Sequence, residues 1–277
     1  MRQVELSAGT IRYRDSGSGP PIVFVHGLLV DGTLWRNVTP ALEDRFRCIV
    51  PDWPLGSHTT PMRPQADLSP RGVARLIGEF LGAMELGDAT IVANDTGGAL
   101  TQMLIAERPE GVGRVVLTPC DAFDNFLPPL FKPLEWSARV PGGLNAMVQS
   151  LRIRPLRRLP FAFGRLIKHP PPHDITNAWL RPFLSDRDIR RDTVRLVRAV
   201  DRRDTLEAAD RLGSFRGQVL IAWATEDRVF PWEHAVRLAE LLPDARLEEV
   251  ADSYSFVPED QPARLAELIG DFLAQPG

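Results

Sequence analysis

The residues Ala93-Asn94-Asp95-Thr96-Gly97-Gly98 constrain the fold more than any other part of the chain. They follow a short apolar run, residues 89–92, and precede a stretch with helical spacing, residues 96–107. Small residues on both sides of a central polar residue let the backbone turn sharply from a strand into a helix. The apex side chain then projects from the turn and faces the helix N-terminus. The segment therefore predicts a strand, a tight turn and a helix, with Asp95 at the apex.

An aspartate at this apex fits two roles. In a small-x-nucleophile-x-small pattern, here with Ala93 and Gly97 as the small residues, the usual occupant is serine. A carboxylate in its place attacks carbon directly and forms an aspartyl ester, because it has no proton to lose first. The alternative is a plain strand-to-helix turn in which Asp95 caps the helix. These residues alone do not decide between the two roles.

Short apolar runs rich in Val and Ile alternate with segments of helical periodicity, as in a parallel sheet that is covered on both faces. The expected strands are residues 21–25, 47–50, 89–92, 114–117, 218–223 and 246–250, and the expected helices are residues 69–86, 96–107, 232–242 and 263–273. Residues 4–6 and 11–14 alternate in polarity and predict an antiparallel edge hairpin. The fold class is therefore α/β, with a mostly parallel central sheet flanked by helices.

Residues 125–212 interrupt this alternation, because they contain proline clusters, many arginines and helical patches such as residues 189–200, with no convincing strand. We expect a core formed by residues 1–124 and 213–277, with residues 125–212 inserted between core strands as a helical cap. The aromatic residues of the cap either line an apolar pocket or join the cap to the core. They are Phe126, Phe131, Trp136, Phe161, Phe163, Trp179 and Phe183.

Two arginine-rich stretches, residues 152–165 and 187–203, lie within the expected cap. They fit either a surface that attracts an anionic substrate or a membrane, or a solvated surface whose arginines pair with nearby acids. The acids in question are Asp186, Asp188, Asp192 and Asp204.

The overall charge argues against nucleic-acid binding, because a net charge of −3 gives no broad basic field. Residues 1–14 lack the apolar core of a signal peptide, and no run approaches the ~18 apolar residues of a membrane span. Cys48 and Cys120 end apolar runs and are expected to be buried thiols, and no metal-ligand spacing occurs. We expect a cytoplasmic monomer or homodimer that binds a small-molecule substrate, without a cofactor, a metal or a stable membrane association.

Four motifs together resemble the α/β-hydrolase superfamily over nearly the whole core. They are the strand leading to His26-Gly27-Leu28, the Asp95 turn, Thr225-Glu226-Asp227 after residues 218–223, and Glu259-Asp260-Gln261-Pro262. Aspartate at the elbow with Gly97-Gly98 after it resembles the haloalkane dehalogenase and epoxide hydrolase branch. The resemblance implies an α/β-hydrolase fold and an enzyme that acts on an apolar or mildly polar small molecule.

The resemblance also implies roles for individual residues. The backbone N–H groups of Leu28 and Thr96 would form the oxyanion hole. Asp227 would be the acid that orients a histidine, with Asp121 as the alternative acid or as a turn former beside Asp124. His26 is expected to pack beneath the loop that follows it.

The sequence departs from this branch at the general base. The histidine is expected four residues before Glu259, but that position is Ser255, and the last histidine of the chain is His234. A serine hydroxyl cannot accept a proton at neutral pH, so an ester at Asp95 would persist unless another group activates water. His58 is the candidate substitute base, with His169 and His173 of the cap as further candidates.

Substrate markers of the branch are also missing. Thr96 and Leu28 occupy positions where haloalkane dehalogenases hold the halide with tryptophan or asparagine, and the tyrosines, Tyr13 and Tyr254, lie outside the cap. Three functions therefore remain open. They are a hydrolase with Asp95 as nucleophile and a non-standard water-activating group, a cofactor-free lyase, isomerase or cyclase using Asp95 as acid or base, and a catalytically degenerate ligand-binding protein.

Overall fold

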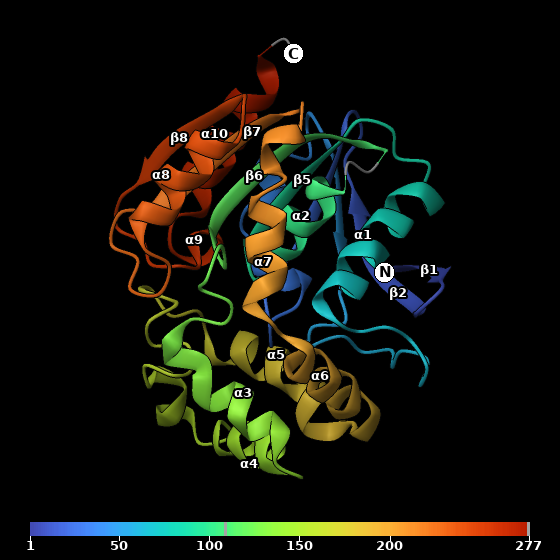
Figure 1. The fold of residues 1–277 in the computed structure, drawn as a ribbon, viewed down its shortest axis with the longest axis vertical. Helices are drawn as coiled ribbons and strands as arrows, with labels where there is room; N and C mark the ends of the chain where they lie inside the picture. The colour runs from blue at the N-terminus through green and yellow to red at the C-terminus, as the bar shows by residue number, and fades with distance from the viewer. Residues whose placement is uncertain (108–109, 276–277) are drawn as a thin grey trace.

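Eight strands form one sheet at the centre of the computed structural model, which describes residues 1–107 and 110–275 (Figure 1). β2 pairs antiparallel with its neighbours β1 and β4, and all other neighbouring strands are parallel. In spatial order the strands are β1 (Arg2–Leu6), β2 (Gly9–Ser16), β4 (Arg47–Pro51), β3 (Pro21–Val25), β5 (Ala89–Asp95), β6 (Val112–Cys120), β7 (Gln218–Ala224) and β8 (Ala245–Val250). The predicted mostly parallel sheet with its N-terminal hairpin is confirmed.

The central strands are apolar because both of their faces are covered. Every residue of β5 is buried, and the Val and Ile residues of β3 and β5, with Val115 and Val116 of β6, form the middle of the core. β5 and β6 each end three residues beyond the predicted ends, at Asp95 and Cys120 instead of residues 92 and 117. Asp95 pairs with Cys120 in the ladder, so these polar and small residues are strand residues despite their composition.

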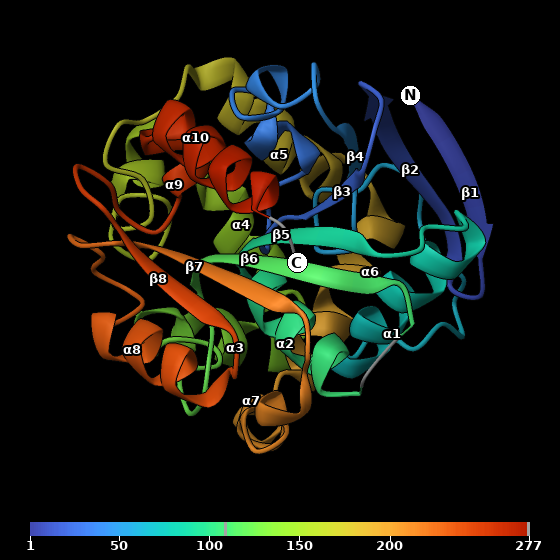
Figure 2. The same cartoon turned by 90° about the horizontal axis from the view of Figure 1, so that it is seen from above.

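Helices cover both faces of the sheet, as Figure 2 shows. α1 (Pro70–Ala83), α2 (Thr96–Ala106) and α8 (Trp232–Leu241) lie on one face, and α10 (Pro262–Ala274) lies on the other, preceded by the short α9 (Val257–Asp260). α1 begins as predicted, because the Ser69 hydroxyl accepts a hydrogen bond from the Gly72 N–H at 3.1 Å. Both cysteines are free and buried, as expected. Within residues 1–107 and 110–275, no helix is long and apolar enough to cross a membrane.

Residues 125–212 contribute no strand to the sheet and hold α3 (Lys132–Arg139), α4 (Gly143–Ser150), α5 (His173–Ser185), α6 (Arg187–Ala199) and α7 (Arg202–Ala209). α3 to α6 form a separate layer in the lower part of Figure 1, beyond the carboxyl ends of β5 and β6. α7 returns along α2 and is fixed by the Thr205 hydroxyl, which donates to the Phe123 carbonyl. The remaining short 3-10 helices are η1 (Gly32–Trp35), η2 (Thr39–Ala41), η3 (Pro129–Phe131), η4 (Arg154–Arg158) and η5 (Leu212–Ser214).

Candidate active site

The turn between β5 and α2 places Asp95 in a conformation that non-glycine residues rarely adopt. Its φ is 56° and its ψ is −134°, a strained combination of the kind that collects at functional sites. The surrounding backbone packs tightly around this turn. A Cβ on Gly27 would lie 2.0 Å from Asp95 Oδ2, and a Cβ on Gly97 would lie 2.5 Å from the Val25 carbonyl oxygen. Glycine at both positions is therefore what lets the turn form.

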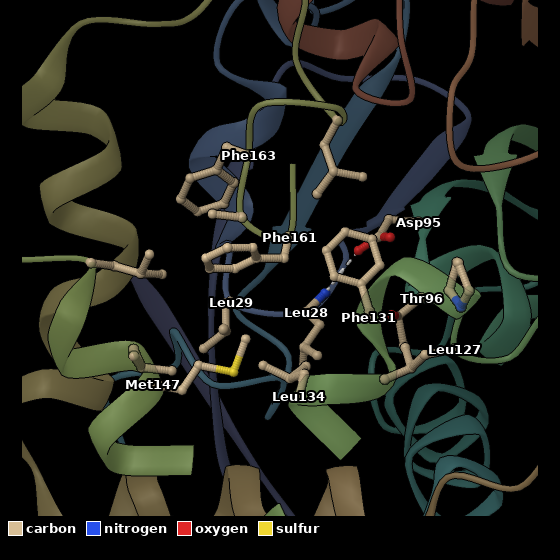
Figure 3. A pocket seen from close by; sticks show the side chains of 15 residues that line it. Leu28, Leu29, Asp95, Thr96, Leu127, Phe131, Leu134, Met147, Phe161 and Phe163 are labelled. Atoms are coloured by element: carbon tan, nitrogen blue, oxygen red, sulfur yellow. Dashed lines mark hydrogen bonds between the residues drawn. The ribbon is translucent and has the colours of Figure 1, made fainter. Parts of the chain in front are cut away.

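The Asp95 carboxylate is held by backbone N–H groups inside an apolar environment. The Leu28 N–H donates to Asp95 Oδ2 at 3.1 Å (Figure 3), and the Thr96 N–H also stabilises the charge. Burial raises the pKa of Asp95 to about 6, because desolvation outweighs the two N–H groups. Asp95 is therefore largely ionised at neutral pH yet poorly solvated. The two groups expected to form the oxyanion hole face the same carboxylate.

Asp227 and Ser255 contact each other near this turn. The Ser255 hydroxyl donates to Asp227 Oδ1 at 3.0 Å, and the same oxygen accepts the Val229 N–H at 2.7 Å and the Phe230 N–H at 2.8 Å. Burial raises the pKa of Asp227 to about 6, with a further contribution from the charge of Asp95. Asp227 Oδ2 is buried and has no hydrogen-bond partner within the described residues. The site thus holds a second carboxylate with a free oxygen.

Asn94 ties the Ser255 loop to the Asp95 turn. Its Nδ2 donates to the Ser255 carbonyl at 2.8 Å, and also to the Pro119 carbonyl at 3.1 Å. Because Asn94 directly precedes Asp95 in β5, residues 161 positions apart are fixed at one end of the sheet. The structure therefore brings Asp95, Asp227 and Ser255 together, as the motifs imply.

Asp121 lies beneath the Asp95 turn. It is fully buried, and the Thr96 hydroxyl donates to its Oδ2 at 3.3 Å. Burial, followed by the negative charge of Asp95, raises the pKa of Asp121 well above its ordinary value. Asp121 therefore supports the turn from below as a buried carboxyl group whose surroundings favour the protonated form.

The structure does not bring His58 to Asp95. His58 is buried with Nε2 3.4 Å from Asp192 Oδ2 of α6, and the Gly56 N–H lies 3.3 Å from its Nδ1. His26 packs beneath the loop as expected. Its Nε2 accepts the Trp53 N–H at 2.9 Å, and burial lowers its pKa to about 4, so its ring is neutral. Among the described residues that line the Asp95 pocket, none is a histidine.

The Asp95 pocket is narrow and apolar (Figure 3). Its cavity volume is about 60 Å³, and one water needs roughly 10–15 Å³ on the same measure. Asp95 is the one ionisable side chain among the described residues lining it, which are Leu28, Leu29, Asp95, Thr96, Leu127, Pro128, Phe131, Leu134, Met147, Val148, Leu151, Phe161, Ala162, Phe163 and Leu166. No cluster of three potential metal ligands occurs in residues 1–107 and 110–275.

All but one of the seven aromatic side chains expected to line a pocket or join the cap to the core are buried or line the Asp95 pocket, and the exception is Trp136. Phe131, Phe161 and Phe163 line the pocket. Phe126, Trp179 and Phe183 are fully buried in the packing around it, whereas Trp136 is 62% exposed. The pocket is thus walled mainly by segments on either side of α3 and α4.

Asp260 was not among the predicted site residues, although it lies within a recognised motif. Its carboxylate accepts the backbone N–H groups of Lys168, His169 and Tyr254 at 3.0, 2.7 and 2.9 Å. The Phe256 N–H also donates to the Leu166 carbonyl at 2.8 Å. These bonds join the loop that carries Ser255 to the pocket wall at residues 161–168.

Comparison with known proteins agrees with this architecture. A family model described as alpha/beta hydrolase fold matches residues 20–262. Haloalkane dehalogenase 2 of Mycobacterium tuberculosis is 30% identical over 287 residues, covering 97% of this chain and 93% of that protein. Cis-3-alkyl-4-alkyloxetan-2-one decarboxylase of Shewanella oneidensis is 27% identical over 280 residues, covering 96% of this chain and 85% of that protein.

Solved structures show the same fold. A haloalkane dehalogenase from Bradyrhizobium elkani has a TM-score of 0.81 at 20% identity, covering 99% of this chain and 97% of that chain. An alpha/beta hydrolase fold protein from Burkholderia ambifaria has a TM-score of 0.82 at 22% identity, covering 98% and 97%. Because the family model matches most of its length, this chain belongs to the α/β-hydrolase fold family, and haloalkane dehalogenases are among its relatives.

Proposed function

We propose that this protein is an enzyme in which the Asp95 carboxylate attacks an electrophilic carbon of an apolar small molecule, breaks the bond from that carbon to a halide or a ring oxygen, and forms an aspartyl ester. The observation that carries the proposal is a single poorly solvated carboxylate facing an otherwise apolar pocket. A carboxylate deprived of water is a better nucleophile than a solvated one, and apolar walls select an apolar substrate. The relationship to haloalkane dehalogenases supports an enzyme of hydrolase type.

Hydrolysis of the ester requires water to attack the Asp95 carbonyl carbon. The N–H groups of Leu28 and Thr96 would stabilise the oxyanion that forms there. We assign the proton-accepting role to Asp227, whose Oδ2 is unpartnered within the described residues and whose pKa of about 6 leaves it charged at neutral pH. Ser255 holds the other oxygen of this carboxylate. In this scheme Asp227 takes the water proton directly, without an imidazole between them. Collapse of the oxyanion then breaks the ester bond to the alcohol oxygen, and the proton passes from Asp227 to that leaving oxygen as Asp95 is regenerated.

A second candidate is a cofactor-free lyase, favoured by the absence of a histidine among the described residues of the pocket lining and by the oxetanone decarboxylase among the relatives. Attack of Asp95 on C4 of an oxetan-2-one breaks the C4–O bond and leaves a carboxylate on C3. Loss of CO₂ from C3 then forms the carbon–carbon double bond and expels the Asp95 carboxylate from C4. This cycle consumes no water and needs no base.

Mass spectrometry of the Asp95 peptide tests both candidates. The protein is incubated in H₂¹⁸O with a haloalkane, an epoxide, an activated ester and an oxetan-2-one. Hydrolysis predicts an adduct on Asp95 and then one ¹⁸O in its carboxylate after a single turnover, whereas the lyase route predicts alkene and CO₂ without the label.

The Asp227→Asn variant separates the two steps of the hydrolytic route. We expect the Asp95 adduct to form at the wild-type rate and to last at least about a hundredfold longer, because a general base contributes roughly 10²–10⁴-fold. Equal adduct lifetimes in the two proteins would remove Asp227 from the mechanism. Turnover without any adduct would replace nucleophilic attack by acid–base chemistry at Asp95, and ligand binding without turnover would indicate a binding protein.

The rate of adduct formation should depend on pH through the ionisation of Asp95. Because burial raises its pKa to about 6, the nucleophilic form is lost as the pH falls through 6. We expect the rate with a haloalkane to be about tenfold lower at pH 5 than on a plateau above pH 7. The haloalkane itself does not titrate in this range. The pH dependence of the rate, measured by mass spectrometry on samples quenched at set times, therefore reflects ionisation of the protein alone. A flat profile from pH 5 to 8 would contradict this assignment.

A further inference from the structure

The two arginine-rich stretches differ in how their charges are balanced. In residues 187–203, Arg191 pairs with Asp188 at 2.9 Å and Asp192 at 2.8 Å, and Arg203 pairs with Asp201 at 2.6 Å. Two of the seven arginines of this stretch are thus paired with acids, and the other five form no ion pair within the described residues. In residues 152–165, by contrast, none of the five arginines forms an ion pair within the described part of the chain; they are Arg152, Arg154, Arg157, Arg158 and Arg165.

Arg157 is the member of this stretch that most needs an explanation. It is only 6% exposed. Its Nε donates to the Leu151 carbonyl at 2.7 Å and its Nη1 to the Thr176 hydroxyl at 2.9 Å, so the guanidinium is fixed in place by neutral groups. Burial of a charge without an opposite charge is costly, and the neighbouring Arg154 adds to the cost through repulsion, which with burial lowers the pKa of Arg157.

A small pocket opens beside this guanidinium. Arg154, Arg157 and Arg158 line it together with His173 and Thr176 at the start of α5. α5 has 13 residues, and no side chain caps its first N–H groups. The cavity volume of this pocket is about 40 Å³, which is enough for a small anionic group. Asp174, the acid in the first turn of α5, is exposed and does not belong to the residues lining this pocket.

We propose that this arginine pocket binds an anionic group, a phosphate or a carboxylate. The bound anion would neutralise Arg157 and accept charge-assisted hydrogen bonds from the guanidinium groups. Phe163 lines both the arginine pocket and the Asp95 pocket. The anion is therefore either free in solution or one end of a substrate whose apolar part lies at Asp95. The second source rests on the proposed function, whereas the anion site itself does not.

Thermal unfolding at constant ionic strength tests the site with inorganic phosphate replacing chloride. We expect a saturable rise in melting temperature for the wild type and for Asp95→Asn. In the double variant Arg154→Gln/Arg158→Gln, whose side chains are exposed and whose fold should survive, we expect at least about tenfold weaker binding. Arg165→Gln, from the same stretch but outside the pocket, is the matched control and should bind as the wild type does. No rise beyond chloride, or equal binding in all variants, would overturn the proposal.

An alkyl phosphate distinguishes the two sources of the anion. If the anion is one end of the substrate, the alkyl phosphate should bind at least about tenfold more tightly than inorganic phosphate and slow the haloalkane reaction at Asp95. Equal affinity of the two phosphates, with the haloalkane reaction unchanged, would assign the site to a free anion. Since phosphate binding is measured without any reaction at Asp95, failure of the anion site and failure of the proposed nucleophile give separate results.

Discussion

Replacement of Asp95 by asparagine should abolish both adduct formation and turnover. The amide has the same shape as the carboxylate but cannot attack carbon, so we expect a loss of about 10³–10⁶-fold, the range seen when a catalytic nucleophile is removed. Asparagine is the informative choice because it tolerates the positive φ that this turn requires, whereas alanine would add backbone strain. Peptide mass spectrometry and steady-state kinetics with the most reactive substrate of the panel measure the effect.

The melting temperature of Asp95→Asn and a matched control variant show whether a loss of activity comes from the missing carboxylate or from unfolding. Burial raises the pKa of Asp95, so its ionised form weakens the folded state at neutral pH, and Asp95→Asn should melt no lower than the wild type. Asp121→Asn is the control, because burial and the charge of Asp95 favour the protonated form of Asp121, and this variant should keep adduct formation largely intact. Adducts that persist at the wild-type rate in folded Asp95→Asn would exclude Asp95 as the nucleophile.

Ser255→His should convert a slow hydrolytic step into a fast one. The Ser255 hydroxyl already lies 3.0 Å from Asp227 Oδ1, so an imidazole introduced there can donate one ring N–H to Asp227 and present the other nitrogen to water. We expect the lifetime of the Asp95 ester to shorten by about 10²–10⁴-fold. Single-turnover kinetics with a haloalkane, which separate ester formation from ester hydrolysis, provide the measurement.

The size of the new side chain must be controlled for. Ser255 is fully buried, so its neighbours must shift, and we expect a cost of about 1–3 kcal/mol in the free energy of unfolding. Ser255→Gln adds comparable bulk without a base, and Ser255→Ala removes the hydroxyl, so neither variant should speed ester hydrolysis. An unchanged ester lifetime in a folded Ser255→His protein would show that position 255 does not face the ester.

Features set by local physical chemistry were predictable from the sequence. The parallel strands follow from runs of Val and Ile that need cover on two faces, and the Asp95 turn follows from the small residues around it. The pairing of Asp227 with Ser255 was implied by family motifs, since residues 28 positions apart in different loops carry no local signal for contact.

Features set by long-range packing were not predictable in the same way. The loop position of His58 indicated the cleft, but its ring meets Asp192, 134 residues away on α6. Asp121 directly follows a strand, as turn residues often do. It is nevertheless fully buried, because β6 ends inside the protein and not at its surface. Arginines such as Arg157 and Arg191 look alike in sequence, and only the three-dimensional positions of the acids show that Arg191 has an acidic partner and that Arg157 has none within the described residues.

The hydrogen bonds of Asp260 and of the Phe256 N–H couple the position of one pocket wall to the position of the loop that carries Ser255. The pocket wall at residues 161–168 cannot swing away from the Ser255 loop unless these bonds break or the loop moves with it. The loop is in turn anchored to β5 through Asn94. Widening the pocket on this side therefore disturbs the geometry around Asp95, whereas none of these bonds involves α3 or α4. We therefore expect a larger molecule to be accommodated most easily by changes in α3 and α4. Substitutions in these two helices should alter the substrate range without loss of the chemistry at Asp95.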